Sequence, residues 1–143
     1  MRSLLVLFTA LTGLVSVVSA DTKTVIETGK KATALVVTES GSNFWTAFCI
    51  DASSGLFVTT ERAVSRANNP RSVTLVINSG EANQKTLTAR VVRTDKGLDL
   101  ALLKVEDAEL LTALDLGTTD GLVETMPLTA FGFAASRVRG DYT

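Results

Sequence analysis

Short apolar segments separated by turn-forming residues occupy most of the chain after residue 32. Residues 72–77 and 86–93 alternate polar and apolar side chains, which is typical of strands with one buried face. Other segments are more continuously apolar and rich in β-branched residues, which also favours strands. Together these patterns predict six strands, at residues 34–38, 44–51, 56–59, 72–77, 86–93 and 98–105.

Six short strands with little helix predict an all-β fold, a six-stranded antiparallel barrel with a short N-terminal helix. Closure of the sheet is expected because open edges of such apolar strands promote aggregation. Four further elements are expected. They are a short N-terminal helix within Thr22–Lys31, helical turns at 61–67 and 107–114, and a last strand candidate at 128–133. No internal repeat or linker is present, so residues 21–143 are expected to form one domain.

The first twenty residues have the pattern of a secretory signal peptide. Arg2 gives a positive start, residues 4–18 are mostly apolar, and Val18-Ser19-Ala20 places small residues at the cleavage site. The alternative is an N-terminal membrane anchor, but the apolar stretch is shorter than the roughly 20 residues that cross a bilayer. We therefore expect cleavage after Ala20 and a secreted or periplasmic protein without a membrane segment.

The charge of the chain is nearly balanced, with a formal net charge of −1. Nucleic-acid binders carry a marked basic excess, so no nucleic-acid partner is expected. The spacing of Asp95, Asp99 and Asp107 is not that of a calcium loop. The sequence predicts no metal site and no cofactor.

The single cysteine, Cys49, lies in the apolar stretch 44–50, which favours a buried inert thiol over a reactive or intermolecular one. Ser53 and Ser54 are interpreted as turn residues, because the sequence contains no histidine to activate a hydroxyl. Trp45 is interpreted as packing rather than as a ligand platform. The tripeptide 139–141, Arg-Gly-Asp, is interpreted as a chance match to an adhesion motif.

Four stretches, in order, carry a resemblance to the trypsin-like serine peptidases of the HtrA/Deg type. They are the strand 32–38, the segment 45–59, the block from Ala89 to Val105 with its Asp-Leu-Ala motif at 99–101, and Phe131-Gly132-Phe133. The resemblance implies that residues 21–143 form the N-terminal barrel of that two-barrel fold. Trp45 and Ala47 replace two glycines of the family hairpin, which is a departure from the pattern.

The family mechanism uses a serine nucleophile, a histidine base and an aspartate that orients the histidine. By resemblance, Asp99 matches the family aspartate, and Arg62 stands where the family has its histidine, within Val58-Thr59-Thr60-Glu61-Arg62-Ala63-Val64. An arginine side chain offers only donors and keeps its proton, so Arg62 is not expected to act as a base. The Gly-x-Ser-Gly-Gly loop, which supplies the nucleophile and the oxyanion hole in the family, has no match in this sequence.

The resemblance places the side chains of Arg62 and Asp99 together at the rim of the barrel. We expect the guanidinium to pair with the Asp99 carboxylate, which is vestigial as a catalytic group. The alternatives are that Arg62 points to solvent or that Glu61 takes its charge, although neighbours in a helical turn face each other poorly.

Three functions stay open. The first is an exported, degenerate trypsin-like peptidase domain that, with this sequence, is not an enzyme and acts by binding or regulation. Its protein or peptide partner would bind at the barrel rim. The second is a truncated fragment of an active trypsin-like serine endopeptidase, and the third is a hydrolase with another mechanism or a completing partner chain.

Overall fold

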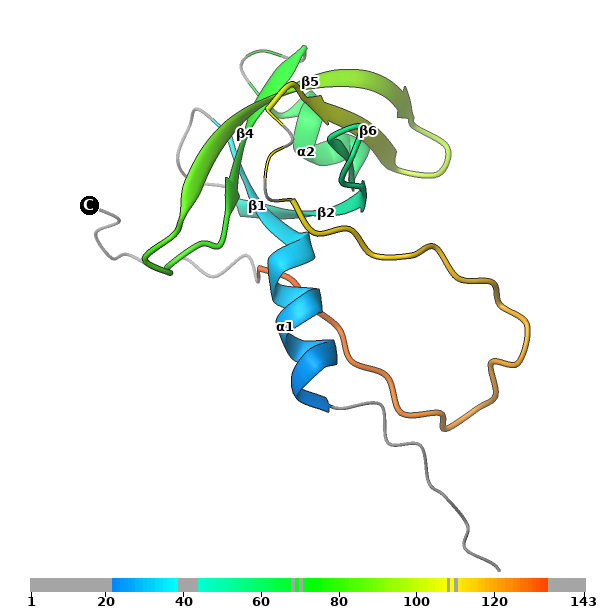
Figure 1. Cartoon of the computed structure of the whole chain (residues 1–143). Coiled ribbons are helices and arrows are strands. Elements are labelled where there is room, and N and C mark those ends of the chain that lie inside the picture. Colours follow the sequence, from blue (N-terminus) through cyan, green and yellow to red (C-terminus); the bar gives the residue numbers. More distant parts are fainter. Residues whose placement is uncertain are drawn as a thin grey trace, which may run out of the picture.

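Six antiparallel strands form a closed barrel, as predicted from the sequence (Figure 1). The computed structural model describes residues 22–38, 44–67, 69, 71–107, 109 and 111–133. The predicted signal peptide 1–20 and the tripeptide 139–141 lie outside these residues. Around the barrel the order is β1 (Thr33–Val37), β2 (Phe44–Asp51), β3 (Leu56–Thr59), β6 (Leu100–Val105), β5 (Lys85–Asp95) and β4 (Ser72–Ile77), which returns to β1.

The barrel interior is filled by alternate side chains of its strands. In β4, for example, Val73, Leu75 and Ile77 are buried while the residues between them are half-buried. The largest fully buried apolar side chains are Phe57, Leu75 and Leu103, which come from three different strands. The interior of a six-stranded barrel is therefore a packed core that leaves no channel.

In the part of the chain that the structure describes, two helices flank the barrel. The helix α1 (Thr22–Ala32) is a full helix with Val25 and Ile26 exposed, and Lys30 and Lys31 lie in its last turn. It passes directly into β1, where the Thr33 hydroxyl donates a hydrogen bond of 2.6 Å to the Gly29 carbonyl. The short helix α2 (Glu61–Ser65) follows β3. No helix in the described part of the chain is both long and apolar enough to cross a membrane.

The segment 111–133 corrects two predictions. The helical turn expected at 107–114 is absent from the described residues of that range. Leu111 and Ala113, two residues apart, both pack against the core, and this period of two fits an extended chain better than a helix. At the start of the loop that follows, the Leu114 N–H donates to the Cys49 carbonyl at 2.9 Å.

The strand expected at 128–133 is also wrong, because this segment forms no strand and pairs with none of the six described strands. Each strand of the closed barrel already has two neighbouring strands, and this segment lies against β2 and α1. It is instead fastened by side chains: the Phe133 N–H donates to Thr46 Oγ1 at 2.8 Å, and the Phe131 ring packs so closely on Gly29 that a Cβ there would collide with it. Residues 115–130 leave the barrel and return to it (Figure 1), and all of them are exposed.

Candidate functional site

The helix α2 begins immediately after β3 and carries Arg62 in its first turn. Its N-cap residue, Thr60, has an extended backbone and makes no capping hydrogen bond with its side chain. The cap comes from elsewhere in the chain, because the Arg62 N–H donates to Asp99 Oδ1 at 3.1 Å. A side-chain oxygen that accepts from the first-turn amides stabilises a helix start. Asp99 therefore holds α2 in place on the barrel.

Asp99 is positioned by the turn between β5 and β6. Its backbone lies in the left-handed region, with φ of 53°, a conformation that aspartate tolerates better than most residues. In the same turn Asp95 Oδ1 accepts from the Leu98 N–H at 3.0 Å. The Asp99 carbonyl accepts from the Glu61 N–H at 3.2 Å, so backbone and side chain both contact the start of α2.

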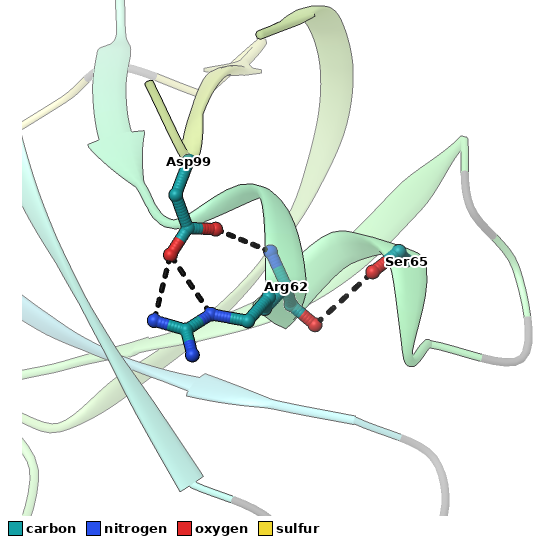
Figure 2. Close-up of polar contacts among 3 residues, drawn as sticks. All are labelled: Arg62, Ser65 and Asp99. Atoms are coloured by element: carbon teal, nitrogen blue, oxygen red, sulfur yellow. Dashed lines mark hydrogen bonds and ion pairs between the residues drawn. The ribbon is translucent and has the colours of Figure 1, made fainter. Parts of the chain in front are cut away.

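Arg62 and Asp99 form the expected ion pair, which confirms the prediction that they pair (Figure 2). Arg62 Nε and Nη2 each lie 2.8 Å from Asp99 Oδ2. Both guanidinium nitrogens thus share one carboxylate oxygen, while the other oxygen accepts from the backbone. The side chain of Arg62 is 64% exposed and that of Asp99 is 32% exposed, so the ion pair lies at the surface of the protein.

The surroundings of Asp99 favour its charged form. The backbone N–H of Arg62 is the largest cause that lowers the pKa of Asp99, and the guanidinium of Arg62 adds to it. An ionised carboxylate whose oxygens both accept hydrogen bonds is a poor proton acceptor. The guanidinium accepts no proton at all. This pair can fix α2 to the β5–β6 turn, but it cannot relay a proton from a nucleophile.

The hydroxyls of Ser53 and Ser54 belong to a turn closed by a carboxylate. Ser53 Oγ donates to Asp51 Oδ1 at 2.7 Å, and the Ser54 N–H donates to the same oxygen at 3.0 Å. These bonds lower the pKa of Asp51 to about 2, and the bond from the Ser53 hydroxyl is the largest cause. Asp51 is therefore not a base for either serine, and the interpretation of both as turn residues is confirmed.

Cys49 is buried, with 1% of its surface exposed, as predicted. Burial raises the pKa of its thiol, so the reactive thiolate is disfavoured. Trp45 is half-buried and packs against the core, while the Arg66 guanidinium lies 5.9 Å from the centre of its ring. Within the described residues, no three of the Asp, Glu and Cys side chains are grouped as metal ligands.

Sequence reasoning missed the capping role of Asp99. The capping bond joins residues 37 positions apart, and no local pattern marks such a contact. The only indication in the sequence is Thr60, a residue type that often caps a helix but here caps nothing.

The closed six-stranded barrel, with Arg62 and Asp99 in contact, agrees with the trypsin-like arrangement that the sequence resemblance predicts. The trypsin-like peptidase domain family matches residues 45–141. The chain therefore belongs to this family, and its barrel is of the HtrA type.

The solved structures that the fold resembles are larger proteases. Two are of the HtrA-type protease AlgW with a tripeptide, one of them a variant. Both are 26% identical and cover 68% of this chain and 30% of their own, with TM-scores of 0.56 and, for the variant, 0.55. A serine endoprotease from Yersinia pestis shares the fold at 18% identity and a TM-score of 0.54, covering 66% of this chain and 32% of its own. The chain thus spans about a third of the length of these proteins. No curated protein matches it.

Proposed function

We propose that this chain is an exported trypsin-like peptidase domain that has lost catalysis and acts by binding a protein or peptide. The observation that carries the proposal is the ion pair of Arg62 with Asp99. By the family pattern these two residues stand at the positions of the base and its orienting aspartate. The aspartate is retained and positioned, but its partner has exchanged an imidazole for a guanidinium.

The loss of the base does not depend on how long the natural protein is. The family places its histidine in this barrel, so a second barrel that supplied a serine would still meet Arg62 at this position. Removal of a triad member leaves only the residual catalysis of binding and the oxyanion hole. The fold meanwhile keeps the barrel, its core and the turn that carries Asp99, all of which a binding domain needs.

Export is supported by the N-terminal pattern of residues 1–20 alone. The proposed mature product begins at Asp21 and is delivered to the periplasm or the exterior. N-terminal sequencing of the product secreted by its own host tests this directly. A first residue of Asp21 supports export with cleavage, and a retained Met1 contradicts it.

The second candidate is a fragment of an active trypsin-like serine endopeptidase, and it is favoured by the coverage of about a third of the related proteases. The natural product decides between the two. It is purified from its host, weighed by mass spectrometry, and incubated with casein and with a fluorophosphonate that labels active serines. The proposal predicts neither labelling nor turnover. Covalent labelling with casein turnover contradicts the proposal and establishes an active peptidase.

A further inference from the structure

The strand β5 is longer than the neighbour that covers one of its sides. It pairs with β4 from Lys85 to Arg90, but its pairing with β6 begins only at Ala89. Among the described strands β5 has no other neighbour. Residues 85–88 are therefore paired on one side, and no described strand covers their other side, where the β4–β5 hairpin runs away from β6 toward its turn (Figure 1).

Alternation along the strand shows which backbone groups face the open side. The Val91 N–H donates to the Arg71 carbonyl at 2.8 Å and so points toward β4. In an antiparallel ladder successive residues point their N–H and C=O groups to opposite sides. Ala89 and Leu87 therefore also face β4, while Thr88 and Thr86 direct their backbone groups to the open edge. Such an edge is a template for pairing with another extended chain.

A groove of about 400 Å³ lies along this edge, with Thr88 and Leu87 on one wall and residues 104–107 on the other. The wall opposite β5 is made by the end of β6 and the residues that follow it. An extended peptide placed in the groove would lie beside residues 85–88 of β5, which β6 does not cover.

The charges beside the groove point to one acidic group on the occupant. Arg90 and Lys104 lie directly opposite each other in the β5–β6 register, and within the described residues neither forms an ion pair. Like charges in facing positions destabilise a sheet, so a carboxylate placed between them would relieve a repulsion. Glu106 and Asp107 also line the groove, which disfavours a peptide that is acidic throughout.

We propose that the open edge of β5 binds an extended peptide as an added strand, with one acidic side chain between Arg90 and Lys104. Thr86 and Thr88 supply the main-chain hydrogen bonds, and the two cations select the acidic residue. Edge pairing of this kind is a common mode of peptide recognition. This inference rests on the proposed binding function and gives it a site and a class of partner.

The first test compares amide hydrogen exchange of the purified chain, free and with a probe peptide. The probe is an eight-residue peptide that alternates threonine and valine and has one central glutamate. In the free chain we expect Thr86 and Thr88 amides to exchange rapidly while those of Leu87 and Ala89 are protected. The probe is expected to slow exchange at Thr86 and Thr88 at least tenfold. Protection of these two amides in the free chain would overturn the proposal, because a second copy or another segment would already cover the edge.

The second test uses variants and a matched peptide with lysine in place of glutamate. Thr88→Pro removes an edge N–H without touching the β4 ladder, and proline is tolerated at such an edge position. This variant is expected to lower the affinity for the glutamate peptide at least tenfold. Arg90→Glu keeps the edge intact and is expected to reverse the preference toward the lysine peptide, whereas the control Lys96→Glu is expected to change neither affinity.

Unchanged affinity in both Thr88→Pro and Arg90→Glu would overturn the proposal, as would binding that shifts only the amides of residues 115–130. These outcomes test the edge site separately from the proposal that the chain is catalytically inactive. Casein turnover would refute the latter and leave the β5 edge as it is, whereas a chain without turnover that ignores both peptides would refute the edge site alone.

Discussion

Substitution of Gly55 by alanine tests how tightly the hairpin that leads to α2 is held on the barrel. Gly55 lies in the turn between β2 and β3, with φ of 65°, and its carbonyl accepts from the Val105 N–H at 3.0 Å. A Cβ on Gly55 would collide with the Val105 carbonyl oxygen and would lie 3.0 Å from Val105 Cγ2. The backbone oxygen cannot rotate away as a flexible side chain would, so the turn or the end of β6 must move.

Gly80 provides the matched control. It too has a left-handed backbone, with φ of 82°, but a Cβ there would meet nothing within 4 Å. The left-handed conformation costs an alanine about 1–2 kcal/mol at either position. Overpacking adds about 1–3 kcal/mol, and only at Gly55. We expect Gly55→Ala to lower the free energy of unfolding by about 2–5 kcal/mol and Gly80→Ala by about 1–2 kcal/mol.

Urea denaturation of the native chain and both variants measures this difference, with thermal melting as a second readout. For a domain of this size each kcal/mol lowers the melting temperature by roughly 4 °C. Equal losses at the two glycines would refute the reasoning, because the close approach of the β2–β3 turn to β6 would then have no energetic effect.

Three further predictions concern single side chains. The pKa of Asp51, about 2 in the folded chain, lies below its unfolded value, so its stabilising effect is complete above about pH 4 and is lost as the pH falls toward 2. Ser53→Ala is expected to raise that pKa in a carboxylate NMR titration, and an unchanged midpoint would contradict the assigned cause. Cys49 is expected to react with a thiol reagent only on unfolding, and rapid labelling of the native chain would contradict its burial. In Arg62→His, Asp99 is expected to raise the pKa of the new imidazole. The added stability is then complete at acid pH and is lost as the pH rises through that pKa. The free energies of unfolding of Arg62→His and Arg62→Ala are compared from pH 5 to 8. A difference that does not change with pH would contradict this prediction.

The barrel was largely predictable because its strands carry strong local patterns. The alternation in β4 and the apolar continuity of β2 reflect the period of two that a half-buried sheet imposes on any sequence. Residues 128–133 have the same apolar character, yet they form no strand. Whether an apolar segment becomes a strand depends on an unpaired strand edge beside it in the folded chain, and the local sequence does not show where the segment will lie.

The candidate site was predictable in part for a related reason. Arg62 and Asp99 were expected to meet because each lies in a motif of the trypsin-like family. The sequence did not indicate that Asp99 divides its two oxygens between the guanidinium and the α2 backbone. It also did not indicate the open edge at Thr86 and Thr88. This edge arises because β6 ends opposite Ala89 and does not reach the first residues of β5. Both features depend on relative strand lengths and long-range geometry.

The central claim is that a guanidinium held on Asp99 occupies the position of the catalytic base. The most direct measurement is the NMR signal of Arg62 Nε–H, recorded in the natural chain and in Asp99→Ala. The ion pair predicts a slowly exchanging, hydrogen-bonded Nε–H that becomes indistinguishable from that of free arginine in the variant. A signal identical to free arginine in both proteins would contradict the claim, because position 62 would then be unconstrained and its side chain free to leave the site.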